Sequence, residues 1–326
     1  MKKIGFLLLA ALLLTALGGC GLEDGLGGQS PDAPQIVTTI FPEYDWVTAL
    51  LGDNPGHADV RMLLDNGVDL HSYQPTAKDI LNISNCDLFI YVGGESDGWV
   101  EDALKEVQNP NQVVINLLEV LGDSAKEEEV VEGMQEEEEE NEDEEEGPEY
   151  DEHVWLSLKN AATLCQTIAD ALGQVDPANQ AVYAANLAAY QAQLADLDRQ
   201  YQSAVDAADV DTLLFGDRFP FRYLTDDYGL HYYAAFVGCS AETEASFETI
   251  TFLAKKVDEL ALSCVMTIEG TDHRMAETII QNTQSKDQRI LALDSMQSAT
   301  MKDVAAGTTY LSIMEKNLAV LKQALE

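Results

Sequence analysis

From residue 35 onward, short apolar runs rich in Val and Ile alternate with longer stretches that have helical spacing. Runs bounded by polar or turn-forming residues are typical of β-strands, and the first half has four, at 35–41, 59–63, 88–93 and 112–116. The helical stretches that separate them lie at 44–52, 76–84 and 99–107. This β-α-β-α order predicts a parallel sheet with helices on its faces. We assign residues 35–158 to an N-terminal α/β lobe.

The second half of the chain shows the same alternation of strand-like runs and helical stretches. Its strand-like runs lie at 212–215, 232–236, 263–268 and 289–293. Helical stretches separate or follow them at 221–229, 243–260, 273–283 and from about residue 308. Residues 210–326 are therefore predicted to form a C-terminal lobe, again a parallel sheet with flanking helices.

The segment 159–209 between the lobes is predicted to be helical, with two helices. Its second helix starts at Asp176-Pro177, a good cap followed by proline at the first helical position. Apolar residues then recur every three or four positions, namely Tyr183, Leu187, Tyr190, Leu194, Leu197, Tyr201 and Val205. A helix over 177–206 would be roughly 45 Å long at 1.5 Å per residue. The predicted fold class is therefore α/β, with two lobes bridged by a long rigid helix.

The first 20 residues have the pattern of an export signal. Lys2 and Lys3 precede an apolar stretch over 4–17, which is too short to span a membrane. Small residues then lead to Cys20, as in bacterial lipoproteins, so we predict a signal peptide over 1–19 and a lipid on the Cys20 thiol. An ordinary signal peptide with an incidental cysteine is the alternative. Residues 20–34 read as a flexible tether, and the protein is expected outside the cytoplasm, anchored to the bacterial cell membrane.

The chain is strongly acidic, with a formal net charge of -40. Residues 127–152 hold 17 of the 58 Asp and Glu residues and no Lys or Arg, so the remaining 41 acidic residues still outnumber the 18 basic ones by 23. Such a charge repels nucleic acid and concentrates cations. The low-complexity stretch 126–150 has too little apolar surface for a core. We predict a disordered acidic loop there, which either collects cations weakly or serves as a solvated linker.

Catalytic and disulfide signatures are missing from the sequence. It contains no HExxH, GxSxG, P-loop or GxGxxG motif. Beyond Cys20, the four cysteines at 86, 165, 239 and 264 show no CxxC spacing, and no pairing among them is predicted.

Two of the five histidines lie at junctions between elements. His71 is on a loop between the run 59–63 and a helix that Thr76 can cap, with Asp79 at its third position. His153 directly follows the acidic stretch. In parallel sheets, ligands bind on the loops beyond the carboxyl ends of strands. Imidazole is the commonest transition-metal ligand, so both side chains are candidate metal ligands.

These motifs resemble a known family, the metal-binding solute-binding lipoproteins of ABC importers for zinc and manganese. "GVDLHSYQPTAKDI" is similar to the family's first ligand loop, and "DEHVWLSLKNA" is similar to its second. "IVTTIFPEYDWVTALLGD" resembles the first strand and helix, and "AETEAS", "IEG" and "LALDSM" follow in the family's order. The resemblance covers about residues 35–326.

The resemblance implies that a metal ion is held between the lobes and that the lobes close only to a limited extent. It places the first two ligands at His71 and His153. The family's third ligand is a histidine, but this sequence has Gly216 where we expect it, so Asp217 is the predicted substitute. Asp294 is the predicted fourth ligand. Glu269 and His273 are alternates.

The resemblance also implies a function, which is capture of a divalent metal ion and its delivery to an ABC permease by a monomeric protein that is not an enzyme. Zn²⁺ is favoured and Mn²⁺ is the alternative, since two imidazoles and two carboxylates suit either ion. A metallohydrolase that uses the same cluster, with Glu269 as base, is a second hypothesis. A surface adhesin or a binder of a chelated metal, through aromatic residues such as Tyr73 and Trp99, is a third.

Overall fold

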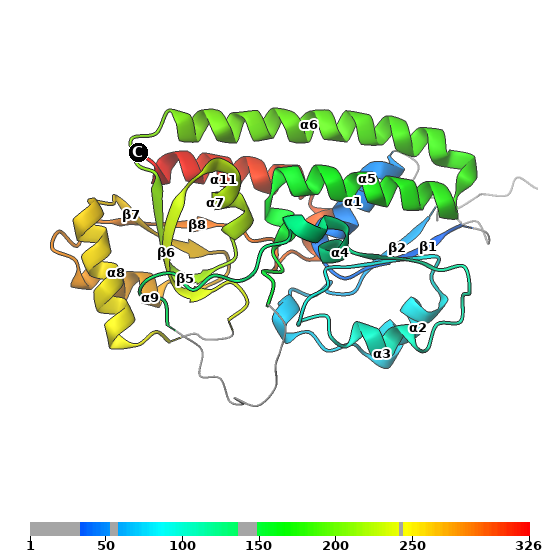
Figure 1. The fold of residues 1–326 in the computed structure, drawn as a ribbon, viewed down its shortest axis with the longest axis horizontal. Helices are drawn as coiled ribbons and strands as arrows, with labels where there is room; N and C mark the ends of the chain where they lie inside the picture. Colours follow the sequence, from blue (N-terminus) through cyan, green and yellow to red (C-terminus); the bar gives the residue numbers. More distant parts are fainter. Residues whose placement is uncertain (1–32, 53–57, 136–148, 241–243) are drawn as a thin grey trace, which may run out of the picture.

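The computed structural model describes residues 33–52, 58–135, 149–240 and 244–326. They form two lobes, each built on a four-stranded parallel sheet (Figure 1). The N-terminal sheet has the order β2-β1-β3-β4 and comprises β1 (Gln35–Thr38), β2 (Asp59–Met62), β3 (Leu88–Tyr91) and β4 (Val113–Asn116). The C-terminal sheet has the order β6-β5-β7-β8 and comprises β5 (Thr212–Phe219), β6 (His231–Val237), β7 (Cys264–Ile268) and β8 (Arg289–Leu293). The predicted fold class is confirmed.

Helices connect the strands of each sheet. The N-terminal lobe has α1 (Phe41–Leu51), α2 (Ala77–Asn85), α3 (Val100–Leu104) and α4 (Leu117–Leu121). The C-terminal lobe has α7 (Arg222–Tyr228), α8 (Phe247–Leu260), α9 (Arg274–Asn282), α10 (Met301–Ala305) and α11 (Tyr310–Ala324). The predicted capping box at the start of α2 is present, because Thr76 and Asp79 each accept a bond from the backbone N–H of the other.

Two long helices join the lobes. The chain runs through α5 (Leu158–Val175), turns at Pro177–Asn179, and returns as the 27-residue α6 (Gln180–Asp206). Helix α6 extends along both lobes (Figure 1) and packs against α1, α5 and α11. Its apolar stripe is buried from Tyr183 to Tyr201, so the predicted spacing does mark the face that contacts the lobes.

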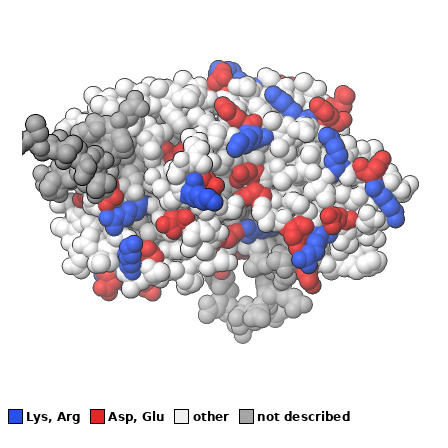
Figure 2. Space-filling model, turned by 180° about the vertical axis from the view of Figure 1, so that it is seen from behind, with Lys and Arg blue, Asp and Glu red and all other residues white. Residues whose placement is uncertain are grey.

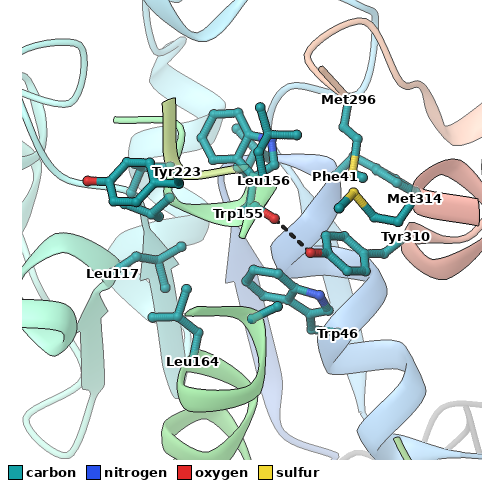
Figure 3. Close-up of a cluster of buried hydrophobic side chains, with 14 of the residues drawn as sticks. Phe41, Trp46, Leu117, Trp155, Leu156, Leu164, Tyr223, Met296, Tyr310 and Met314 are labelled. Carbon is teal, nitrogen blue, oxygen red and sulfur yellow. Dashed lines mark hydrogen bonds between the residues drawn. The ribbon is translucent and has the colours of Figure 1, made fainter. Parts of the chain in front are cut away.

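A shared hydrophobic core lies where the two lobes meet (Figure 3). Trp46 of α1 packs edge-on against Tyr310 of α11, with ring centroids 5.2 Å apart. The Tyr310 hydroxyl donates to the Trp155 carbonyl at 2.7 Å, and the Trp155 indole donates to the Ser295 carbonyl at 2.9 Å. These aromatic side chains are buried, and the polar atoms of Tyr310 and Trp155 bond across the junction. The lobes therefore share one packed interior rather than a flexible hinge.

The acidic segment is ordered at its ends, contrary to the prediction that all of 126–150 is disordered. Residues 127 and 150 form an antiparallel bridge, and residues 126–135 run onto the C-terminal lobe. Glu129 pairs with Arg222 at 2.6 Å, Glu132 pairs with Lys256 at 3.7 Å, and Met134 is buried. Basic partners and a few apolar side chains therefore hold this part in place. The rest of the predicted loop, 136–148, lies outside the described residues.

Acidic and basic side chains are interspersed on the face seen in Figure 2. The excess of acidic residues is therefore not gathered into one patch on that face. Within the described ranges, none of the helices has both the length and the apolar character that a membrane-crossing segment needs. The predicted signal peptide, Cys20 and most of the tether lie outside the described residues.

Candidate metal centre

His71 reaches the junction of the lobes from the loop that follows β2. It lies in a short 3-10 helix, Leu70–Ser72, and its backbone N–H donates to the capping Asp69 carboxylate at 3.1 Å. Its side chain is only 7% exposed. Nδ1 lies 2.8 Å from Ser96 Oγ and 3.5 Å from a Glu152 carboxylate oxygen. These oxygens favour a proton on Nδ1, which leaves the Nε2 lone pair free.

His153 is held even more firmly. Its side chain is fully buried, and both its backbone N–H and Nδ1 lie 2.9 Å from Asp151 Oδ1. The carboxylate keeps the proton on Nδ1 and directs Nε2 away from itself. Trp155, two residues on, belongs to the core shared by the lobes and contacts the His153 ring. The position of this imidazole is therefore fixed by the interlobe packing.

The Nε2 atoms of the two histidines face each other and are 3.3 Å apart. Two lone pairs at this distance repel unless a proton or a cation lies between them. In tetrahedral Zn²⁺ coordination, with Zn–N bonds of 2.0–2.1 Å, two ligand nitrogens are about 3.3 Å apart. Burial and the nearby His153 lower the pKa of His71 to about 3, so its imidazole is neutral and able to bind a metal near pH 7.

Cys239 is the third donor at this point, and the sequence analysis missed it. One donor atom from each of His71, His153 and Cys239 lies within 4.8 Å of the other two. Cys239 is two residues beyond the end of β6, and its backbone N–H donates to Glu128 at 3.1 Å. Burial and the Glu128 carboxylate raise the pKa of the thiol well above its usual range. The available signal was its place just after a predicted strand, where ligands of parallel sheets gather.

The region around Gly216 differs from what the family resemblance led us to expect. A Cβ atom on Gly216 would lie 2.8 Å from the Ala276 Cα atom of α9, so no histidine could project from that position. Asp217 lines the interlobe cavity, but its carboxylate accepts from the backbone N–H groups of Arg218 at 3.0 Å and Ile268 at 3.2 Å. The strand register shifts between Phe215 and Arg218, which reorients these side chains. Asp217 is not brought together with the two histidines.

The remaining predicted residues stabilise loops of the C-terminal lobe. Asp294 accepts from the backbone N–H of Met296 at 2.8 Å. Glu269 accepts from the backbone and hydroxyl of Ser295 at 2.7 and 2.9 Å. His273 lines the same cavity as His71 and has a left-handed backbone, with φ of 57°. Among the described residues, Asp294, Glu269 and His273 are not part of the cluster that contains His71 and His153.

A polar contact between the lobes adjoins the histidines. Asp69 of the N-terminal lobe forms an ion pair with Arg218 of the C-terminal lobe. With its amide nitrogen toward Asp69, Gln297 donates to both carboxylate oxygens at 2.8 and 2.9 Å. Its oxygen accepts from His153 Nε2 at 2.9 Å, a bond that a metal ion on Nε2 would replace. Asp69, His71 and Arg218 also line a cavity of about 740 Å³ between the lobes.

Two buried carboxyl groups adjoin the centre, since Glu152 contacts His71 and Asp97 interacts with Glu152. Glu152 Oε2 and Asp97 Oδ1 are buried, and neither has a hydrogen-bond partner. Burial raises the pKa of Asp97 to about 7 and raises that of Glu152. Unsatisfied buried oxygens are costly, and a bound cation would stabilise the ionised forms of both groups. The arrangement therefore suits a divalent ion between the lobes.

The fold is that of a two-lobed binding protein, and the histidine pair at the lobe junction is a candidate cation site. Residues 36–324 match the family described as zinc-uptake complex component A, periplasmic (ZnuA). The match extends over most of the chain. The protein therefore belongs to the ZnuA family, as the resemblance predicted. That description is of an uptake component and not of an enzyme.

Named relatives agree with this assignment. The zinc-binding lipoprotein AdcA of Streptococcus pneumoniae R6 is 31% identical over an alignment of 328 positions, which covers 100% of this chain but 62% of AdcA. The high-affinity zinc uptake system protein ZnuA of Bacillus subtilis is 29% identical, with 98% of this chain and 96% of that protein aligned. This chain thus spans less than two thirds of AdcA and nearly all of the Bacillus protein.

Solved structures show the same fold. The Zn(II)-bound ZnuA-like domain of Streptococcus pneumoniae AdcA superimposes with a TM-score of 0.69 at 28% identity, covering 90% of this chain and 99% of that one. The metal-dependent lipoprotein YcdH of Bacillus subtilis gives a TM-score of 0.70 at 26% identity, with the same coverage.

Proposed function

We propose that this protein captures Zn²⁺ outside the cytoplasm and delivers it to an ABC permease. The observation that carries the proposal is the pair of buried imidazoles whose Nε2 atoms face each other at 3.3 Å. Their Nδ1 atoms are engaged by Ser96 and Asp151, so both are positioned as metal donors. The zinc-binding names of the relatives support the same ion.

The proposed location follows from the start of the sequence. A signal peptide over 1–19 and a lipid on Cys20 would hold a monomer at the outer face of the cell membrane, with residues 20–34 as the tether. The relative AdcA is named a lipoprotein, which supports this arrangement. Mass spectrometry of the membrane fraction tests it, since a diacylated Cys20 is expected as the first residue of the mature chain.

The alternatives receive less support from the centre. A metallohydrolase needs a placed general base, and both Glu269 oxygens accept hydrogen bonds from Ser295. Capture of a metal chelate calls for exposed aromatic rings, but Tyr73, Trp155, Phe219 and Phe221 are buried and Trp99 is half-buried. Mn²⁺ prefers carboxylate and water oxygens, whereas the facing donors here are imidazole nitrogens.

Calorimetric titration of the metal-free protein from Gly21 onward tests the proposal. We expect one tight Zn²⁺ site in the unmodified protein and none in His71→Ala or His153→Ala. His231→Ala is the matched control, because His231 is exposed at the start of β6 and lies outside the cluster. Tight binding that survives in both cluster variants would refute the assignment of the site.

We further propose that the acidic segment collects cations near the cleft. Its ordered ends lead to Glu128, which bonds to Cys239, and to Asp151, which orients His153. Deletion of 136–148 is expected to remove several weak Zn²⁺ equivalents and to leave the tight one intact. An unchanged number of weak equivalents would support the solvated-linker alternative.

A further inference from the structure

Gly238 allows the loop that carries Cys239 to approach His153 closely. A Cβ atom at this position would lie 2.9 Å from His153 Cε1, 3.0 Å from His153 Nδ1 and 3.0 Å from the Phe219 carbonyl oxygen. These distances are shorter than normal van der Waals contacts. Only glycine therefore lets the backbone pass directly against the imidazole and bring the next side chain to the histidine pair.

The Cys239 side chain lies at that point, where its thiol also interacts with the Glu128 carboxylate. It forms no disulfide, and its backbone is anchored by Glu128 at 3.1 Å. Arg218, which comes from the neighbouring strand β5, is occupied by its ion pair with Asp69. Within the described part of the chain, the sulfur completes the one convergent group of three metal-binding side chains.

We propose that the Cys239 thiolate is the third protein ligand of the captured ion, which makes this a His₂Cys site selective for Zn²⁺ over Mn²⁺. The inference rests on the proposed function and specifies its ligands. With Zn–S bonds of about 2.3 Å, a tetrahedral ion separates sulfur from each nitrogen by about 3.6 Å. The donor atoms lie within 4.8 Å of one another, so binding all three would require a contraction of at most about 1.2 Å.

The donor set explains the expected selectivity. Thiolate is a soft ligand that Zn²⁺ binds well, whereas Mn²⁺ prefers oxygen donors. One thiolate and two neutral imidazoles leave a Zn²⁺ complex with one positive charge, and the buried Glu152 and Asp151 carboxyl groups lie against the two histidines. Three protein ligands also leave a fourth coordination position open. Exchange of the ion with a partner can then proceed without first breaking a protein bond.

Cobalt substitution tests the inference, because Co²⁺ bound to a thiolate shows a sulfur-to-metal charge-transfer band in the near ultraviolet. The reduced, metal-free protein from Gly21 onward is titrated with Co²⁺ alone. We expect the band to saturate at one equivalent, to be lost in Cys239→Ser, and to persist in Cys264→Ser. Cys264 is the matched control, since it is buried in β7 of the same lobe and lies outside the cluster.

Zn²⁺ affinity provides the second measurement. Cys239→Ser should bind Zn²⁺ at least about 100-fold more weakly, because even partners that only orient a ligand are worth 10–100-fold. One equivalent of Co²⁺ bound without the band, or Zn²⁺ affinity unchanged in Cys239→Ser, overturns the cysteine ligand but leaves the proposed function standing. No tight binding of either ion by the unmodified protein overturns both. The band of the unmodified protein decides the matter even if Cys239→Ser fails to fold.

Discussion

Asp151 orients His153, and its replacement by asparagine provides a quantitative test of the centre. The Asp151 carboxylate oxygen accepts from both the backbone N–H and Nδ1 of His153, each at 2.9 Å, and both residues are buried. Asparagine is nearly isosteric and can retain the backbone bond through its amide oxygen. It cannot supply the negative charge that keeps the Nδ1 proton in place and strengthens Nε2 as a donor.

The expected effect can be worked out from these contacts. A hydrogen bond to a charged group contributes about 1.5–3 kcal/mol, and 1.4 kcal/mol corresponds to a tenfold change in affinity. Since part of the interaction survives in Asp151→Asn, we expect Zn²⁺ affinity to fall by about 10–100-fold, the range known for partners that orient metal-binding histidines.

Competition between the protein and a chromophoric zinc chelator measures this change. Asp227→Asn is the matched control, because Asp227 is a carboxylate shielded from solvent that bonds to Ser157 and Lys159 rather than to a histidine. Circular dichroism melting of the metal-free variants checks that both fold. A Zn²⁺ affinity of Asp151→Asn within about twofold of the unmodified protein would refute the view that this carboxylate prepares His153 for a metal.

Three further predictions concern the supporting structure. Burial raises the pKa of Asp45 from 3.8 to about 6, so its ionisation destabilises the fold above pH 6 by up to about 3 kcal/mol and not at all below about pH 4. Asp45→Asn should therefore raise the free energy of unfolding in urea at pH 7.5 and leave it unchanged near pH 4; a gain independent of pH contradicts this. Gly238→Ala should weaken Zn²⁺ binding about 10-fold or more in the same chelator competition, because its Cβ atom would displace the His153 ring. An unchanged Zn²⁺ affinity would show that the loop around residue 238 moves to make room and leaves His153 in place. Tyr310→Phe removes the hydrogen bond to the Trp155 carbonyl and should lower the free energy of unfolding by about 1–3 kcal/mol. An unchanged midpoint of urea unfolding would mean that this bond does not stabilise the fold.

The fold could be predicted from the sequence because its signals are local. Strand-like runs bounded by breakers, and an apolar stripe on α6, depend only on the spacing of nearby residues. His71 and His153 could also be found, since each lies in a distinctive stretch at the junction of two elements. The composition of the acidic segment concealed its ordered part, because its order depends on Arg222 and Lys256, which lie far along the chain.

Cys239 could not be identified in the same way. A single cysteine in a loop carries no motif, and its approach to His153 depends on Gly238 and on how the two lobes pack. Asp217 and Asp294 occupy plausible loops in the sequence, but their carboxylates bond to nearby backbone groups instead. Local sequence shows which side chains could bind a metal, whereas the packing of the lobes decides which of them meet.

The aromatic core shared by the lobes has a consequence for the heat of metal binding. Trp46, Trp155 and Tyr310 already exclude water at the junction without any ion. Binding therefore has little apolar surface left to bury, and burial of apolar surface is the main source of a negative heat-capacity change. Zn²⁺ uptake should consequently show an enthalpy almost independent of temperature once buffer protonation is subtracted. A protein that closed two separate lobes around its ligand would instead show a steep temperature dependence.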